Sequence, residues 1–132
     1  MIDIKGVAHF SIPVTDMARS QAFYTDVVGL KPLALVGNDT MSFLDAGGVC
    51  VILCQQDGAI DNSAQGPNRV HHSFIVDTET YKTLHDQLSA KGVDVEFEED
   101  RQGGVVNGPR LYFRDPDGTS LEFIDLTSYA GA

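Results

Sequence analysis

Two stretches of this sequence begin almost alike, His9-Phe-Ser-Ile-Pro-Val14 and His71-His-Ser-Phe-Ile-Val76. Each has the alternating apolar pattern of a strand, and each is followed by a helix-like segment with a glycine near its end, Gly29 or Gly92. The pattern indicates an internal duplication. Because each copy begins with a histidine, the duplication places a candidate metal ligand in each half.

Both halves predict the same order of strand, capped helix and three further strands. In the first half, the expected elements are a strand at 7–14, a helix over about 17–28 capped by Thr15 or Asp16, and strands at 33–36, 41–45 and 49–54. In the second half, they are a strand at 70–76, a helix over about 79–90 capped by Asp77 or Thr78, and strands near 94–98, 110–114 and 119–126.

The length of 132 residues predicts a single domain, 1–132, made of two modules. Module 1 covers about 5–56, a polar linker about 57–69 and module 2 about 70–128. A βαβββ unit this small cannot bury both faces of its sheet, so two must combine. We expect an α+β fold in which the two βαβββ modules pair into a mixed, curved sheet that forms a concave metal-binding cleft.

Strand parity separates the two adjacent histidines of the second half. His71 shares one face with Ser73, whereas His72 falls with Phe74 on the apolar face that packs against the helix. His9 holds the matching position in the first half. We therefore expect His9 and His71 to face the cleft and His72 to be a core residue.

The last strand supplies a third candidate ligand. Leu121 and Phe123 form its core face, so Glu122 points to the other side. Two neutral imidazoles and one carboxylate form the 2-His-1-carboxylate set, which holds a divalent metal on one side and leaves the other side open. The predicted metal ligands are His9, His71 and Glu122.

Composition excludes several classes of protein. The formal net charge of −10 argues against nucleic acid or an anionic membrane surface as partner, although it is compatible with a cationic ligand. No apolar run approaches the roughly 18 residues of a membrane span, and the first residues do not resemble a signal peptide. Cys50 and Cys54 would lie about 13 Å apart in one strand, too far to pair within it. We expect free thiols and a cytoplasmic location.

The motifs together resemble the vicinal oxygen chelate superfamily, which includes glyoxalase I, bleomycin resistance proteins, fosfomycin resistance enzymes and extradiol dioxygenases. The matching segments run from Val7 to Tyr24 with Gly29-Leu30, from His71 to Asp77, and from Leu111 to Glu122. They cover nearly the whole chain. The resemblance implies a metalloenzyme that chelates a small substrate through two adjacent oxygens, and a homodimer whose metal site is either within one chain or shared between two.

The ligand set narrows this resemblance. Glyoxalase-like members add a fourth ligand from the first half, but overlaying Gly48–Ile52 on Gly118–Glu122 places Ile52 at that position, and isoleucine cannot bind a metal. A glyoxalase of the usual kind is therefore disfavoured. The remaining set resembles fosfomycin resistance enzymes and extradiol dioxygenases, both of which carry a tyrosine at the position of Tyr112.

Neither resemblance extends to the residues around the substrate. The additional histidines of extradiol dioxygenases fall on Gln56 and Gly103, and the phosphonate-binding basic residues of fosfomycin resistance enzymes fall on Gln102 and Gly131. Arg110 and Arg114 share the parity of Tyr112 and could bind a carboxylate, although structural salt bridges are the favoured interpretation.

The leading expectation for function is dioxygenase-type chemistry, since three protein ligands leave room for a bidentate substrate and dioxygen. Tyr112 is the expected catalytic residue, as an acid–base or orienting group. A glyoxalase- or fosfomycin-resistance-like lyase, isomerase or transferase is the alternative. Fe(II) or Mn(II) is favoured, with Zn, Ni and Co as further candidates. A non-catalytic, bleomycin-resistance-type protein that binds a cationic drug is the alternative from another class.

Overall fold

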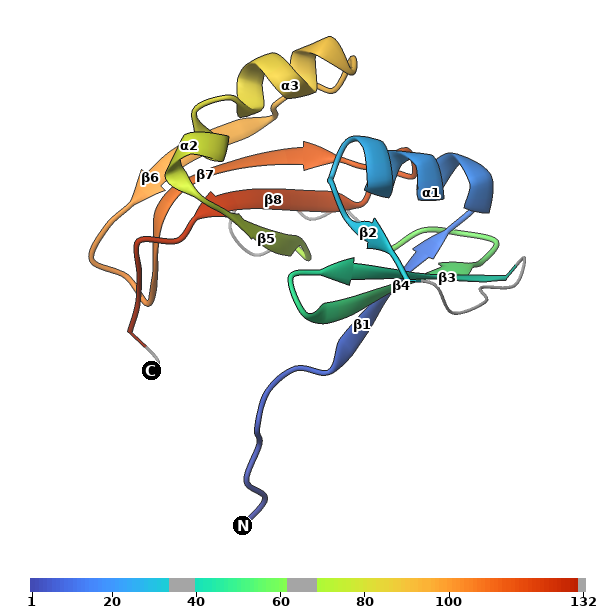
Figure 1. Ribbon diagram of the computed structural model, residues 1–132, viewed down its shortest axis with the longest axis horizontal. Coiled ribbons are helices and arrows are strands. Elements are labelled where there is room, and N and C mark those ends of the chain that lie inside the picture. The colour runs from blue at the N-terminus through green and yellow to red at the C-terminus, as the bar shows by residue number, and fades with distance from the viewer. Residues whose placement is uncertain (34–39, 62–68, 131–132) are drawn as a thin grey trace. The chain divides into compact units, whose positions relative to one another are not determined.

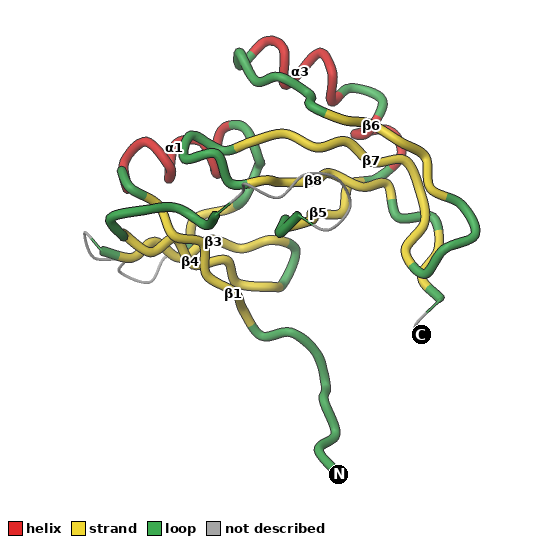
Figure 2. The backbone as a smooth tube through the Cα atoms, turned by 180° about the vertical axis from the view of Figure 1, so that it is seen from behind, coloured by secondary structure: helices red, strands yellow, loops and turns green. Residues whose placement is uncertain are grey.

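The computed structural model describes residues 1–33, 40–61 and 69–130, and it divides into two compact units, Met1–Ile60 and Asp61–Ala132. In each unit, four strands are hydrogen-bonded in a row and the same unit contains α-helix. The expected α+β class is therefore confirmed (Figures 1 and 2). The boundary between the units falls in the expected linker. Of the expected elements, residues 34–36 lie outside the described part of the chain.

Unit 1 follows the order strand, helix, three strands. Its elements are β1 (His9–Val14), α1 (Met17–Asp26), β2 (Lys31–Pro32), β3 (Met41–Ala46) and β4 (Val49–Gln55). The strands lie in the order β1-β4-β3-β2, with β1 parallel to β4 and the other neighbours antiparallel.

Unit 2 repeats this plan. Its elements are β5 (His72–Val76), α2 (Thr78–Tyr81), α3 (Leu84–Ala90), β6 (Phe97–Arg101), β7 (Val106–Arg114), β8 (Ser120–Asp125) and β9 (Ser128–Tyr129). The strand order β5-β8-β7-β6, with β5 parallel to β8, is the order of unit 1, which confirms the duplication.

The register within each unit supports the sequence overlay of the two halves. In unit 1, Ser11 pairs with Ile52 across the β1–β4 ladder. In unit 2, Ser73 pairs with Glu122 across the β5–β8 ladder. Since Ser11 and Ser73 are equivalent in the duplication, Ile52 stands where unit 2 has its glutamate.

Three predicted elements of unit 2 were wrong in their bounds. The helix expected over 79–90 is two helices, because the chain tightens at Thr83, whose amide donates to the Thr80 carbonyl three residues back. The strand expected at 110–114 begins earlier, at Val106, since Val106 pairs with Tyr129 in the short β9. The strand expected near 94–98 forms at Phe97–Arg101 instead.

Aspartates cap the first helix of each unit. The Asp16 carboxylate accepts from the Arg19 amide at 3.1 Å, and the Asp77 carboxylate accepts from the Thr80 amide at 2.7 Å. These bonds resolve the choice of cap in favour of aspartate in both halves.

Each sheet buries a face of alternating apolar residues, and the central strands β7 and β8 of unit 2 are buried on both faces. The buried core residues are Ile12, Val14, Leu44, Val51 and Leu53 in unit 1 and Leu111, Phe113, Leu121 and Phe123 in unit 2. Their parity leaves His9, Ser73 and Glu122 on the opposite faces, as expected. Both cysteines are free thiols. None of the described helices is long and apolar enough to cross a membrane.

Candidate metal and substrate site

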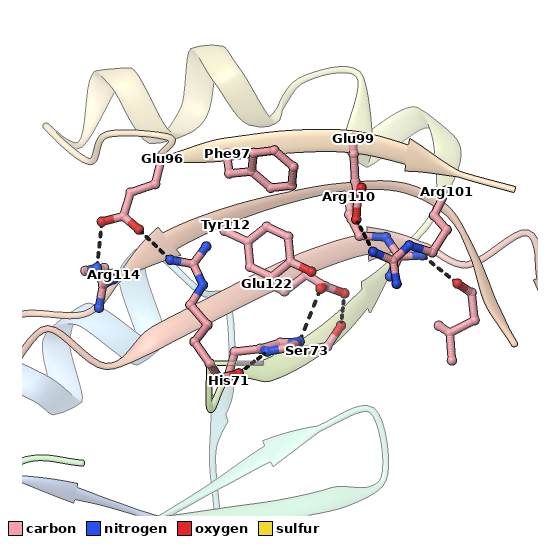
Figure 3. Close-up of a pocket in the computed structure, with 12 residues that line it drawn as sticks. His71, Ser73, Glu96, Phe97, Glu99, Arg101, Arg110, Tyr112, Arg114 and Glu122 are labelled. Carbon is pink, nitrogen blue, oxygen red and sulfur yellow. Dashed lines mark hydrogen bonds and ion pairs between the residues drawn. The ribbon is translucent and has the colours of Figure 1, made fainter. Parts of the chain in front are cut away.

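Glu122 is a buried carboxylate in the middle of β8. Only 2% of the residue is exposed, although its neighbours Leu121 and Phe123 point to the opposite, apolar face. Its Oε1 accepts a hydrogen bond from the Ser73 hydroxyl at 2.6 Å (Figure 3). Its Oε2 is buried and has no hydrogen-bond partner among the described residues. One oxygen is therefore anchored, and the other is left for a ligand.

His71 lies directly before β5 and faces this free oxygen. Its Nδ1 is 3.0 Å from the carbonyl oxygen of Arg69, which assigns the proton to Nδ1 and leaves a lone pair on Nε2. That Nε2 lies 3.5 Å from Glu122 Oε2 (Figure 3). A backbone carbonyl that orients the far nitrogen of the ring is a frequent feature of metal-binding histidines.

The His71–Glu122 pair fits a divalent cation. A separation of 3.5 Å is too long for a strong hydrogen bond, and a buried carboxylate oxygen without a partner is costly. Two ligands that each lie about 2.1 Å from one ion, at an angle of about 110°, are about 3.4 Å apart. The nitrogen and carboxylate oxygen are also donors that divalent transition metals accept.

His9, the third predicted ligand, lies at the start of β1 in unit 1. Its side chain is exposed, and it pairs in register with Cys50 of β4. The two units are described separately, and within the described ranges no three His, Cys, Asp or Glu side chains form a metal-binding cluster. The structure therefore brings together two of the three predicted ligands, and the metal-binding roles of all three stay predictions.

His72 occupies the other face, as expected. It pairs with Leu121 in the β5–β8 ladder, and burial, followed by the neighbouring His71, lowers its pKa. A half-buried imidazole beside Leu121 is suited to packing. His71, not His72, lies against Glu122.

Tyr112 lies beside Glu122 on the neighbouring strand β7. Its ring meets the His71 ring edge-on at 5.3 Å, and the Arg69 guanidinium lies 5.0 Å from its centre. Burial, followed by the Glu122 carboxylate, raises the pKa of Tyr112 to about 12. The hydroxyl remains protonated at neutral pH, so it is suited to donate a hydrogen bond and unsuited to act as a base.

These residues line a cavity of about 1050 Å³ within unit 2 (Figure 3). The lining residues are Arg69, His71, Ser73, Glu96, Phe97, Glu99, Arg101, Val106, Arg110, Tyr112, Arg114 and Glu122. Four arginines and three glutamates make this cavity slightly positive in a chain of net charge −10. The cavity lining therefore does not share the acidity of the chain as a whole.

Several lining residues were not predicted. Phe97, Glu99 and Arg101 alternate along β6, and this period of two is the sequence signal that could have placed them on the face of Tyr112. Arg69 carries no such signal, because it precedes β5 and was included in the expected linker.

The arginines differ in their partners. Arg114 bonds to Glu96 at 2.6 Å and to the Gly118 carbonyl, so the expected salt bridge is confirmed for this residue. Arg110 instead donates to the carbonyls of Gly108 and Val106. The salt bridge expected for Arg110 is not found in the described part of the chain.

Near Ile52, the described residues of unit 1 show Gln55 engaged with the backbone and not free to act as a fourth ligand. The Gln55 side chain donates to the Thr15 carbonyl at 2.7 Å and accepts from the Met17 amide at 3.1 Å. Gln55 thus holds the start of α1. This arrangement supports the expectation that a glyoxalase of the usual kind is disfavoured.

The fold and the candidate site of this chain agree with its membership of a known family. Residues 6–123 match the Glyoxalase/Bleomycin resistance protein/Dioxygenase superfamily, and the chain belongs to it.

Among curated proteins, the chain is similar to the metallothiol transferase FosB of Staphylococcus haemolyticus, with 28% identity over 119 residues, 90% of this chain and 82% of that protein. It is 26% identical over 119 residues to the glutathione transferase FosA of Serratia marcescens, covering 90% of this chain and 76% of that protein. Among solved structures, the chain is similar to a variant of the fosfomycin resistance protein FosX from Listeria monocytogenes, which was solved in complex with Mn(II) and dihydroxypropylphosphonic acid. The TM-score is 0.73 at 21% sequence identity, and the match covers 93% of this chain and 91% of that chain.

These relatives confirm that the chain is an enzyme of this superfamily, and they support a divalent metal in general. They do not support the dioxygenase chemistry that the sequence placed first. The transferase alternative agrees better with them. Gly131, the position matched to a phosphonate-binding residue, lies outside the described residues.

Proposed function

We propose that this chain is a divalent-metal-dependent transferase of the fosfomycin-resistance type, whose small substrate is held through adjacent oxygens. The sulfur of a thiol attacks an epoxide carbon of this substrate, the carbon–oxygen bond of the epoxide breaks, and the thiol proton ends on the resulting hydroxyl group. His9, His71 and Glu122 are the proposed metal ligands, and Tyr112 orients the substrate. The observation that carries the proposal is the buried Glu122 Oε2, which has no described hydrogen-bond partner and faces His71 Nε2 at 3.5 Å.

The bound metal would act as a Lewis acid that polarises a substrate oxygen. Mn(II) is the proposed ion, in agreement with the FosX complex. The chain's own residues prepare the site for it. The Ser73 hydroxyl holds one oxygen of Glu122, and the Arg69 carbonyl fixes the orientation of the His71 ring. Such supporting contacts reduce the reorganisation that binding requires.

Tyr112 is the proposed orienting residue. It neighbours Glu122 on β7, and its ring is held between His71 and Phe97, whose centres lie 5.3 and 5.9 Å away. A tyrosine held in this way can donate its hydroxyl hydrogen to a substrate oxygen and keep the reacting carbon facing the incoming thiol.

The charge of the cavity argues against a metal-free protein that sequesters a cationic drug. Four arginines and three glutamates line the cavity, so it has no surplus of carboxylates that would attract a cationic drug. The net negative charge of the whole chain, which is compatible with a cationic ligand, is therefore not found in the lining of this cavity.

Turnover of fosfomycin tests the proposal. The Mn(II)-loaded chain is incubated with fosfomycin and either glutathione or cysteine, and the phosphorus NMR signal of the substrate is followed. We expect consumption that requires both Mn(II) and a thiol and that is lost in Glu122→Gln. Failure of both thiols would contradict the proposed reaction. Oxygen uptake with catechols after Fe(II) loading would favour the dioxygenase instead.

A further inference from the structure

We propose that Arg110 binds an anionic group of the substrate, a carboxylate or a phosphonate, and so determines which small molecules the cavity accepts. This inference rests on the proposed function above. It adds the charge of the substrate and the residue that recognises it.

Arg110 is a buried cation in the wall of the cavity. The residue is 4% exposed, and a guanidinium stays charged in proteins. Its Nε donates to the Gly108 carbonyl at 3.3 Å, and its Nη2 donates to the Val106 carbonyl at 2.7 Å. These two bonds hold the plane of the guanidinium in place, but neutral carbonyls do not cancel its charge.

The other arginines of the cavity have carboxylate partners. Arg69 pairs with Glu96. Arg114 also pairs with Glu96, and Arg101 pairs with Glu99 (Figure 3). No carboxylate among the described residues forms an ion pair with Arg110. A buried charge without a counter-ion carries a desolvation penalty of several kcal/mol. An anion that enters the cavity would reduce this penalty.

The register places Arg110 next to the proposed metal site. Arg110 and Tyr112 share one face of β7, where Tyr112 pairs with Glu122 and Arg110 pairs with Ile124. Two residues along a strand correspond to about 7 Å. A small molecule whose metal-binding oxygens lie a few bonds from its anionic group could therefore reach both. The planar guanidinium suits an oxyanion because it offers parallel N–H donors.

The net charge of the loaded site favours the same class of ligand. A divalent cation held by Glu122 and neutral histidines retains a positive charge. Arg110 adds a second positive charge on the same wall. The field at this end of the cavity then attracts anions, although the chain as a whole is acidic.

Binding of simple oxyanions to matched variants tests this inference. The full-length Mn(II)-loaded chain is titrated calorimetrically with methylphosphonate and with propionate, as wild type, Arg110→Gln, Arg110→Lys and Arg114→Gln. Arg114→Gln is the matched control, because it removes the same charge from the same strand while Glu96 keeps its pair with Arg69. The Mn(II) affinity of each protein is measured first.

We expect wild type to bind at least one of the two anions. Arg110→Gln should weaken this binding by about tenfold or more, which is the typical effect of losing a charged hydrogen bond, and Arg110→Lys should lie between the two. Arg114→Gln should remain within about threefold of wild type. The inference would be overturned if wild type and Arg110→Gln bound the anions with equal affinity, or if Arg110→Gln and Arg114→Gln lost affinity equally. It would also be overturned if wild type bound neither anion. Failure of wild type to bind Mn(II) would instead overturn the proposed metal function.

Discussion

At the scale of single residues, the site depends on the difference between two equivalent positions. Glu122 and Ile52 hold the same place in the two ladders, opposite Ser73 and Ser11. The duplication therefore keeps the serine in both units but the carboxylate in only one. A hydroxyl opposite a carboxylate can orient a metal ligand, and a hydroxyl opposite an isoleucine cannot.

Replacing Ser73 tests this supporting role. Ser73→Ala removes the 2.6 Å hydrogen bond to Glu122 Oε1 and leaves the carboxylate less well oriented. We expect Mn(II) affinity to fall by roughly 10- to 100-fold with little change in the thermal midpoint. Ser11→Ala is the control, because its neighbour is Ile52. An affinity in Ser73→Ala equal to that in the control would show that the anchor is dispensable.

At the scale of elements, turns and caps position the strands that carry the site. Asp77 ends β5 and begins α2, and its carboxylate accepts from the Thr80 amide. This backbone hydrogen bond is the main cause of a lowered pKa for Asp77. A group whose pKa is lower in the folded state stabilises the fold above the unfolded pKa, and this stabilisation is lost as the pH falls through the folded value.

The cap therefore predicts a pH-dependent effect. Asp77→Ala should lower the thermal midpoint at pH 7, and the difference from wild type should shrink below a pH of about 4, as the carboxylate is protonated. Asp77→Asn should retain part of the cap without this pH dependence. Thermal unfolding followed by circular dichroism between pH 3 and 7 measures both. A difference that stayed constant over this range would contradict the role of the charge.

Gly108 allows β7 to approach the end of β8. Its φ is +129°, and a Cβ there would lie 2.0 Å from the Asp125 carbonyl oxygen. Gly108→Ala should therefore destabilise the fold by about 2–4 kcal/mol. Gly104→Ala is the control, because the nearest atom to its Cβ would be the Asn107 side-chain oxygen at 3.4 Å, and its effect should be within about 0.5 kcal/mol. Chemical denaturation compares the two, and equal midpoints would refute the close approach.

Local patterns predicted most of the elements and the faces of their strands. Alternation separated His71 from His72 and placed Glu122 opposite the core, because these are properties of one strand. The break between α2 and α3 was missed, since residues 79–90 contain neither proline nor glycine to mark it. The salt bridge of Arg114 was predicted, but the carbonyl partners of Arg110 were not. The hydrogen bonds of Arg110 depend on where the backbone places the carbonyls of Val106 and Gly108, and the sequence pattern does not show the path of the backbone there.

At the scale of the whole molecule, the duplication separates the proposed ligands between two units. His9 belongs to unit 1, and His71 and Glu122 belong to unit 2. β1 and β5 are also edge strands in their own sheets. Exposed strand edges favour association, and closed two-fold assembly is its commonest form. We therefore propose a homodimer, in which the three ligands come from one chain or from both.

Mixing two inactive variants distinguishes these arrangements. His9→Ala and Glu122→Ala chains are unfolded and refolded together, and Mn(II) binding is measured after hybrid formation has been verified. A site shared between chains should restore up to about a quarter of the wild-type sites, because half of the dimers are hybrids and one of their two sites is intact. Hybrids without any restored binding would place each site within one chain.

His71 and Glu122 are the proposed ligands of a divalent metal, and their binding of Mn(II) can be measured directly. The most direct measurement is calorimetric titration of Mn(II) into the metal-free chain as wild type, His71→Ala, Glu122→Gln and, as the packing control, His72→Leu. We expect about one ion per wild-type chain, retained binding in His72→Leu, and affinity at least about 100-fold weaker in the other two variants with their folds intact. Wild-type affinity in His71→Ala, or loss of binding in a folded His72→Leu alone, would show that His71 and Glu122 are not the ligands.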